Sequence, residues 1–427
     1  MRYLIVFFII FRNEESIMGT IVIKFGGSSL STTDKIKQAA QRIAAQKAAG
    51  KNVVVVVSAM GKTTDQLLDL AGQITDKPEK REMDMLLTTG EQVSISLLSM
   101  ALAEINIPAV SLTGWQAGIK TEKVHSNARI VDVDISHVAR KIEEGKVIVC
   151  AGFQGVTEDG EITTLGRGGS DTTAVALAAA LKAERCSICT DVTGVYTTDP
   201  RYIEGARQLS SISYDEMLEL ANLGAGVLHP RAVEFAKNHQ VDLEVRSSTE
   251  DVEGTVIEEE VTMEKNLAVR GVAFENNITR LTVLGLENEL TALSSIFTAL
   301  AKNHIDVDII IQSQTDSNRT NLSFSIHDQD LQATVSVLNA LKTDLGFEAI
   351  ESEAGLAKVS IVGSGMVSTP GVAAKMFQVL ANDDISVKMV STSEIKVSVV
   401  IEESKMIEAA QILHDEFELG VVAEEVY

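Results

Sequence analysis

The first half of the chain alternates short hydrophobic runs with longer amphipathic stretches. Residues 53–57 are five consecutive valines, which is typical of a parallel strand buried on both faces. Repeated strand-then-helix order predicts an α/β domain whose mostly parallel sheet is sandwiched by helices. The expected strands are 20–24, 53–57, 109–112, 147–151 and 187–190, and the expected helices include 34–49, 83–104, 136–144 and 174–181.

The pattern changes after Gly254. Residues 265–344 and 351–427 resemble one another at an offset of 80 residues. Each copy predicts strand, helix, strand, strand, helix, strand, as in a ferredoxin-like unit. Neither copy carries a conspicuous nucleophile or metal cluster, so the pair predicts a ligand-binding or assembly module. The matching pairs are Phe297 and Phe377, Leu300 and Leu380, Ala301 and Ala381, Ile305 and Ile385, and Val307 and Val387.

The first residues form a separate segment. Residues 4–11 are apolar, but this run is too short to span a bilayer and no small-residue cleavage site follows it. Met18 stands just before the first strand, so we expect the true start there and no structural role for the preceding residues. The predicted division is an N-terminal extension at 1–17, a catalytic domain at 18–258, and two repeats at 265–345 and 351–427.

The net charge and the cysteine count restrict the classes of partner that the chain can bind and the compartment in which it works. The formal charge of −23 argues against nucleic acid or an anionic membrane surface, because both require clustered Lys and Arg. Three cysteines do not make a disulfide framework, which favours a reducing cytoplasm. Cys186 and Cys189 lie in a strand-like run, so we interpret them as buried thiols and predict no metal site on protein ligands.

Residues 164–174 are the strongest candidate for chemistry. Their three glycines let backbone amides approach a ligand, and Arg167 offers a planar fork for a carboxylate or phosphate. Ser170 stands where we expect the N-cap of the following helix, so an anion should bind here. A lone Gly-x-Gly-Gly is also typical of an ordinary turn, and this segment by itself does not decide between the two.

Other polar segments also follow predicted strands. Lys24 opens a glycine turn, and Ser58 follows the valine strand. Because parallel strands end at one edge of a sheet, Lys24, Ser58, Arg167 and Asp191 could converge on one cleft. Residues 190–201 are rich in hydroxyls and suit a nucleotide, although a polar loop explains them equally well. No P-loop and no dinucleotide fingerprint is present.

Together these segments resemble the aspartate kinases, which combine the amino acid kinase fold with two C-terminal ACT domains. The likeness covers the chain from Met18 onward. The matching segments are 24–29, 88–91, 166–171, 190–201, 228–232, 370–371 and 391–396.

The resemblance implies transfer of the γ-phosphoryl group of ATP, with Mg²⁺, to the side-chain carboxylate of L-aspartate. It implies that Lys24 contacts the transferring group, that Arg167 holds the α-carboxylate of aspartate, and that Glu91 pairs with its ammonium group. Asp171 would orient Lys24 or the magnesium hydration shell. The remaining implied contacts are Ser58, Thr64 and Ser170 with substrate, and Gly26, Gly27, Ser28, Thr190, Asp191, Tyr196 and Arg201 with the nucleotide.

The resemblance also implies feedback inhibition by lysine, threonine or both, bound at Ser391, Thr392 and Glu394, in a homo-oligomer joined through the ACT domains. The chain departs from the family pattern at two places. Thr249 stands where some relatives have a nucleotide-contacting lysine, and residues 287–290 differ from the corresponding loop of the second copy.

Two alternatives stay open from the residues alone. A related enzyme of the same fold, acting on glutamate, acetylglutamate, carbamate or UMP, would explain the glycine segments but not the repeat or Glu91. A non-catalytic amino-acid sensor would explain the repeat, but it has no chemical need for Lys24, Arg167 and Asp171 together.

Overall fold

The computed structural model describes residues 19–223, 227–259, 267–287, 290–314 and 319–420. Residues 1–17 and Met18, for which the sequence predicts an extension and a start, lie outside these ranges. The described chain forms two compact units. The first contains the residues up to Val195, together with Gln208–Asn222 and 227–259, and the second contains Tyr196–Arg207 and the residues from 267 onward.

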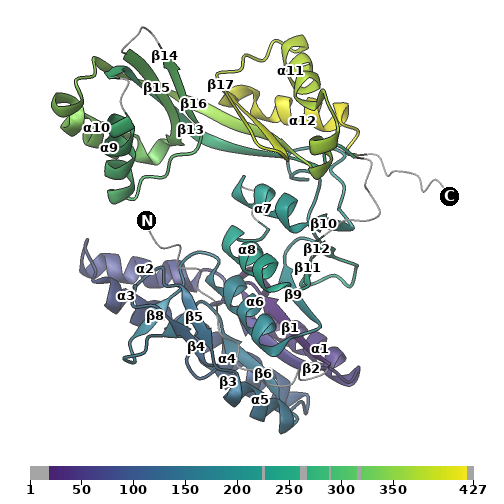
Figure 1. Ribbon diagram of the computed structural model, residues 1–427. Coiled ribbons are helices and arrows are strands. Elements are labelled where there is room, and N and C mark those ends of the chain that lie inside the picture. Colours follow the sequence, from purple (N-terminus) through teal and green to yellow (C-terminus); the bar gives the residue numbers. More distant parts are fainter. Residues whose placement is uncertain (1–18, 224–226, 260–266, 288–289, 315–318, 421–427) are drawn as a thin grey trace. The chain divides into compact units, whose positions relative to one another are not determined.

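An eight-stranded sheet organises the first unit (Figure 1), in the order β10-β12-β11-β9-β1-β2-β6-β3. Every neighbouring pair is parallel except β11 with β12, which confirms the predicted mostly parallel sheet. The strands are β1 (Thr20–Phe25), β2 (Asn52–Val57), β3 (Ala109–Leu112), β6 (Val147–Ala151), β9 (Arg185–Thr190), β10 (Ser211–Ser213), β11 (Leu243–Ser247) and β12 (Thr255–Glu258).

The first unit also contains eight α-helices in its described residues. They are α1 (Thr33–Ala48), α2 (Thr63–Ile74), α3 (Lys80–Leu87), α4 (Thr89–Glu104), α5 (Ser136–Glu143), α6 (Gly169–Leu181), α7 (Tyr214–Asn222) and α8 (Pro230–His239), with a 3₁₀ turn at Ser28–Leu30. The single helix expected at 83–104 is interrupted at Thr88. The stretch Lys80–Glu104 is long and apolar enough to cross a bilayer, but its side chains Ile95, Leu98 and Leu102 pack into the core, as in a core helix of a soluble protein.

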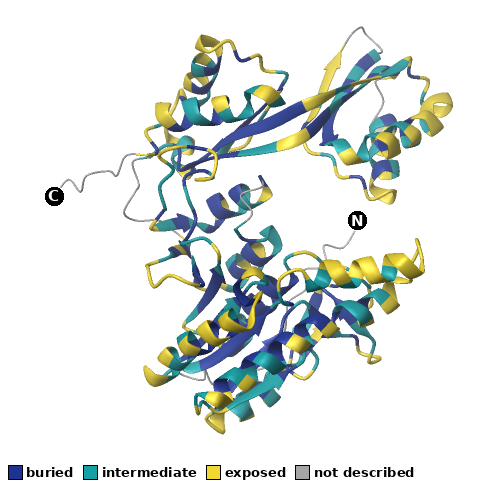
Figure 2. Ribbon diagram, turned by 180° about the vertical axis from the view of Figure 1, so that it is seen from behind, coloured by how far each residue is buried: buried dark blue, intermediate teal, exposed yellow. Residues whose placement is uncertain are grey.

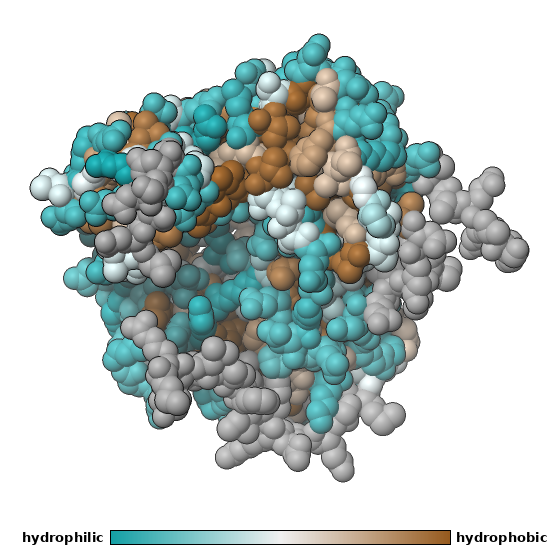
Figure 3. All heavy atoms as spheres, turned by 45° about the horizontal axis from the view of Figure 1, so that its top comes forward, coloured by the Kyte–Doolittle hydropathy of each residue, from teal (hydrophilic) through white to brown (hydrophobic). Residues whose placement is uncertain are grey.

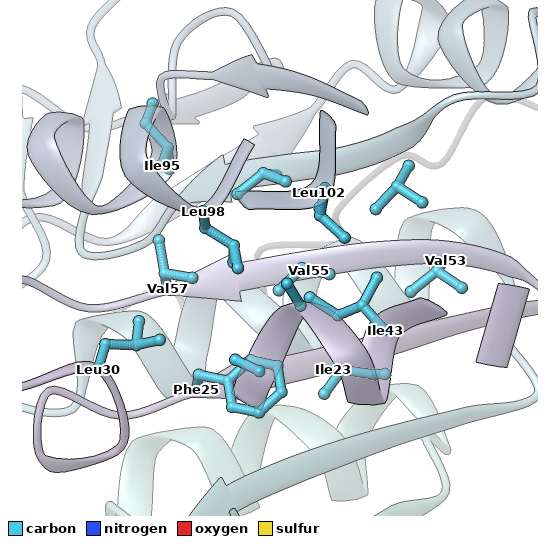
Figure 4. Close-up of a cluster of buried hydrophobic side chains, with 14 of the residues drawn as sticks. Ile23, Phe25, Leu30, Ile43, Val53, Val55, Val57, Ile95, Leu98 and Leu102 are labelled. Atoms are coloured by element: carbon cyan, nitrogen blue, oxygen red, sulfur yellow. The ribbon is translucent and has the colours of Figure 1, made fainter. Parts of the chain in front are cut away.

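The core of the first unit lies between the sheet and helices α1 and α4. Val53, Val55 and Val57 of β2 meet Ile43 of α1 and Leu98 of α4 (Figure 4). The strands are buried while the outer faces of the helices are exposed (Figure 2). The three cysteines are free and buried, as expected.

A second, four-stranded sheet in this unit was not predicted. Its order is β5-β4-β7-β8. Three of its strands have only three residues, too few for a hydrophobic period to appear in the sequence. The strands are β4 (Ile119–Thr121), β5 (Ile130–Val133), β7 (Gln154–Val156) and β8 (Ile162–Thr164).

The second unit is built on a six-stranded antiparallel sheet in the order β14-β15-β13-β16-β18-β17. Its elements are β13 (Gly271–Glu287), α9 (Leu290–Lys302), β14 (Ile310–Gln314), β15 (Arg319–His327), α10 (Leu331–Leu345), β16 (Ala349–Val362), α11 (Val372–Asn382), β17 (Met389–Thr392), β18 (Lys396–Glu402) and α12 (Met406–Glu416), with 3₁₀ turns at Asp328–Asp330, Ser364–Ser368 and Glu403–Lys405.

The internal repeat is visible in the packing of the second unit. Leu300 and Leu380 are each 1% exposed, and Ile305 and Ile385 are each 5% exposed, in two separate hydrophobic clusters. The two copies share their central strands, because β13 and β16 pair along nearly their whole length. The last strand expected in the second copy falls within 421–427, outside the described residues.

The sheet–helix core supports a direct stability test. Replacing Ile43, which is fully buried, with alanine should lower the free energy of unfolding by about 2–5 kcal/mol, because it removes buried methyl groups and leaves a cavity. The same substitution at Ile74, which is 86% exposed, should change it by less than about 0.5 kcal/mol. Urea unfolding followed by fluorescence and circular dichroism measures both, and equal losses would contradict this packing.

Candidate functional site

An ion pair joins the end of β1 to the first turn of α6. Lys24 Nζ lies 2.6 Å from Asp171 Oδ1, and both side chains are almost buried. Asp171 Oδ1 makes no well-directed hydrogen bond, so the pairing is chiefly electrostatic. The two residues belong to strand and helix segments far apart in sequence, and the fold brings Asp171 to Lys24, as the family resemblance implied.

The two glycines after β1 lie close to Lys24 and to the loop that follows β2. A β-carbon on Gly26 would lie 3.5 Å from Lys24 Nζ, and one on Gly27 would lie 2.8 Å from the carbonyl oxygen of Ala59. The Gly26 amide donates to the Cys189 carbonyl, whereas the Gly27 amide donates to no residue that the structure describes. Ser58 ends β2 beside this turn, and its amide donates to the Phe25 carbonyl. The Gly27 amide is therefore available to an anion next to Lys24.

Glu91 lies at the start of α4, against the same loop. Its Oε1 accepts a hydrogen bond of 3.1 Å from the Ala59 amide, while Oε2 is buried without a partner among the described residues. Burial raises the pKa of the carboxyl group to about 7. Gly90 makes this close approach possible, since a β-carbon there would lie 2.8 Å from that of Ala59. The unsatisfied oxygen is suited to a cationic partner such as an ammonium group.

The glycine-rich loop leads into α6, but the expected cap is wrong. The helix begins at Gly169 and its N-cap is Gly168, with φ of +67°, so Ser170 lies inside the first turn. Only glycine adopts this left-handed conformation at little cost, which lets the helix start two residues early. Ser170 is 8% exposed and packs against Gly152, where a β-carbon would clash with its hydroxyl.

Arg167 is exposed and makes no hydrogen bond to any residue in the described ranges. The backbone two residues before it, in contrast, is held by hydrogen bonds. Arg231 of α8 donates from Nη1 to the Leu165 carbonyl and from Nη2 to the Ala128 carbonyl, both at 2.6 Å. His229 caps α8 by accepting a hydrogen bond from the Arg231 amide, which is a structural role. The guanidinium group of Arg167 is thus free to receive a ligand on a fixed loop.

The candidate nucleotide residues divide between the units. Thr190 and Asp191 end β9 in the first unit, where the Thr190 carbonyl accepts from the Ser248 amide. Tyr196 and Arg201 belong to the second unit, and Arg201 forms an ion pair of 2.7 Å with Asp199. The structure therefore does not gather these four residues within one unit.

The remaining candidate site residues lie at helix starts, at the end of a strand or in turns. Thr64 is half-buried in the first turn of α2, and Ser28 opens the 3₁₀ turn after Gly27. Ser391 and Thr392 end β17 and Glu394 lies in the following turn, all in the second unit. No cluster of three metal-ligating side chains occurs in the described part of the chain.

Two charged side chains next to the glycine loop at 164–168, Asp84 and Arg231, had no role predicted from the sequence. Asp84 of α3 is fully buried, and it accepts hydrogen bonds from His125, Ser126 and Thr164. An isolated carboxylate in the apolar run Met83–Leu87 was the available signal. Arg231 lies in a segment that resembles the family, but only the tertiary structure shows that its guanidinium group donates to two backbone carbonyls.

Comparisons with known proteins show the family to which this chain belongs. The profile of the amino acid kinase family matches residues 19–247, and that of the ACT domain matches residues 359–417. The aspartokinase of Bacillus sp. (strain MGA3) is 68% identical over 403 residues, which are 94% of this chain and 98% of that relative. The chain belongs to the aspartokinase family. It is an amino acid kinase with a C-terminal ACT regulatory region.

Two solved aspartokinase structures resemble the whole chain. Both are of Escherichia coli aspartokinase III and are 26% identical to this chain, covering 93% of it and 99% of the solved chains. One, described as the R-state, holds aspartate and ADP and has a TM-score of 0.77. The other, described as the T-state, holds lysine and aspartate and has a TM-score of 0.75.

The raised pKa of Glu91 predicts a pH effect on stability. Its carboxyl has a pKa of about 7 when folded and 4.5 when exposed, so the folded state holds the proton more tightly. The tighter proton binding adds to the free energy of unfolding. This stabilisation is full below pH 4.5 and is lost as pH rises through about 7.

Glu91→Gln should remove this loss. Across the window the free energy of unfolding of the wild type should fall relative to that of the variant, by on the order of 3 kcal/mol. Urea unfolding at a series of pH values measures the difference. Glu104→Gln, at an exposed position on the same helix, is the control and should run parallel to the wild type. Parallel curves for Glu91→Gln would contradict the raised pKa.

Proposed function

We propose that this aspartokinase transfers the γ-phosphoryl group of ATP to the side-chain carboxylate of L-aspartate, giving 4-phospho-L-aspartate and ADP. The observation that carries the proposal is the grouping in the first unit of Lys24, the Gly27 amide and the unsatisfied Glu91 carboxylate around one turn. Cationic and anionic groups side by side suit a phosphate and an ammonium group in one site. The ADP and aspartate in the E. coli relative support both ligands.

The residues have complementary roles in this proposal. Lys24 and the Gly27 amide stabilise the charge of the transferring group, and Asp171 keeps the lysine aimed at it. Arg167 receives the α-carboxylate of aspartate in its planar fork, while Glu91 receives the ammonium group. The attacking carboxylate is ionised at neutral pH, so the reaction needs positioning and charge neutralisation and no general base.

The described residues fit a nucleotide-bound magnesium ion without a dedicated protein cage. Mg²⁺ commonly takes one or two carboxylates and completes its shell with phosphates and water. Asp171, the carboxylate that pairs with Lys24, would face the hydration shell of the ion. When bound, the ion neutralises phosphate charge. We further propose Thr190, Asp191, Tyr196 and Arg201 for nucleotide contacts, as the family resemblance implies.

The second unit is the proposed site of feedback inhibition and assembly. Its edge strands β14 and β17 carry the exposed apolar side chains Ile310 and Val390, which are 51% and 38% exposed. On the face that Figure 3 shows, hydrophobic side chains form a band over this unit. Exposed sheet edges with apolar residues favour pairing with another chain, so we propose a homo-oligomer. Lysine in the T-state relative supports an amino-acid effector.

Activity provides the first test of the proposal. Purified protein with Mg-ATP should release ADP when L-aspartate is added, and much less with L-glutamate. Lys24→Met should lower kcat by about 100- to 1,000-fold, because it removes the cation at the transferring group. Lys37→Met, at a side chain that is 73% exposed, is the matched control and should retain wild-type rates. Aspartate binding without turnover in the wild type would support a sensor instead.

Regulation is tested separately. Lysine, threonine or both together should suppress the aspartate-dependent rate. Glu394→Gln and Ser391→Ala should weaken that suppression at least about fivefold, since they remove contacts made only with the effector. Inhibition curves at fixed substrate measure this, with Glu403→Gln as a control on another turn of the same unit. A parallel loss of the uninhibited rate would count against a purely regulatory role.

A further inference from the structure

A buried carboxylate lies behind the proposed aspartate site and belongs to none of the roles above. Asp84 is 0% exposed. Its Oδ1 accepts from the Thr164 hydroxyl at 2.6 Å, its Oδ2 lies 2.8 Å from His125 Nδ1, and the Ser126 amide donates to both oxygens. A carboxylate only accepts, so His125 must donate its Nδ1 proton. A buried charge is costly unless such donors satisfy it, and here they come from two chain segments outside its own helix.

These segments meet at the glycine loop. Thr164 ends β8, three residues before Arg167, and its carbonyl accepts from the Ala128 amide at 2.9 Å. Gly166 has φ of +76°, and a β-carbon there would lie 2.7 Å from Asn127 Oδ1. Asp84 thus fixes both sides of this contact, the segment 125–128 and the end of β8.

Arg231 holds the same contact through other atoms. Its two hydrogen bonds reach the carbonyls of Leu165 and Ala128, one on each side of the contact. His229 packs on Gly168, where a β-carbon would lie 2.1 Å from that of the histidine. The loop from Thr164 to Gly168 is therefore fixed from α3 by one charged side chain and from α8 by another.

Among the described residues, the Arg167 side chain makes no hydrogen bond or ion pair that could set its direction. We propose that Asp84 and Arg231 are positioning residues, which form a clamp on the backbone of the glycine loop and thereby aim the Arg167 guanidinium at the α-carboxylate of the substrate. This inference rests on the proposed function, in which Arg167 binds that carboxylate. A displacement of about 1 Å in such a group can cost on the order of 100-fold in rate.

The test is a kinetic comparison of Asp84→Asn with the wild type. The amide removes the charge and keeps only one acceptor oxygen, so at least one of the donors at His125, Ser126 and Thr164 loses its acceptor and the loop is held less firmly. We expect the KM for aspartate to rise about tenfold or more, with the KM for ATP changed by less than about threefold. Thr164→Val should act in the same direction, and Thr164→Ser, which keeps the hydroxyl, should stay near the wild type.

Glu216→Gln is the matched control. Glu216 is also a buried carboxylate, 1% exposed, and it accepts from the Ser213 amide and hydroxyl on another loop of the first unit. The Glu216→Gln variant should have a lower melting temperature than the wild type and an unchanged KM for aspartate. If Asp84→Asn does not fold, the Thr164 pair supplies the same comparison.

A double-mutant cycle separates positioning from a general structural role. In an Arg167→Ala background, Asp84→Asn should change kcat/KM for aspartate by less than about twofold, because the group that it aims is gone. An undiminished effect in that background would overturn the clamp, as would a lowered melting temperature with an unchanged KM for aspartate. A wild type that shows no aspartate turnover would overturn the proposed function, and the clamp with it.

Discussion

The ion pair between Lys24 and Asp171 depends on nearly every feature of the first unit. The lysine is aimed by β1, which lies between β2 and β9 in a buried parallel sheet. The aspartate is aimed by α6, whose first turn starts at Gly169 because Gly168 takes a left-handed conformation. Since parallel strands end at one edge, the turns after β1 and β2 lie together, and the Gly27 amide and Glu91 come with them. A change in the sheet register would separate all four groups.

Around this centre, polar groups are buried in two different ways. Burial raises the pKa of Glu91, and its second oxygen, which has no partner among the described residues, is open to a cation. Both carboxylate oxygens of Asp84 accept hydrogen bonds, and these bonds hold the loop backbone in place. An unsatisfied buried group costs stability and is suited to a ligand, whereas a satisfied one costs less and rigidifies its surroundings. This difference separates a group that binds from one that positions.

The two copies in the regulatory unit are one folded body. Because β13 and β16 pair with each other and each carries strands of both copies, neither copy has a complete sheet alone. The loop Tyr196–Arg207, which follows the β9 segment, also belongs to this unit. The Thr197 carbonyl accepts from the Val272 amide, and Ile203 lies in the hydrophobic cluster of the second copy. The chain therefore leaves the first unit, packs into the second and returns.

The sequence by itself determined the parallel sheet, the repeat and the approach of the turns at Lys24 and Ser58, because buried strands and glycine turns leave local patterns. The role of Glu91 came only from the family resemblance. The domain boundaries, the oligomer and the residue roles stay predictions. The break at Thr88, the early start of α6, the four-stranded sheet and the placement of Tyr196 and Arg201 were decided only by the tertiary structure. So were the contacts of Asp84 and Arg231. Several of these depend on partners far along the chain, 103 residues away for Arg231 and Ala128 and 217 for Thr197 and His414, and no pattern within one segment encodes such a partner.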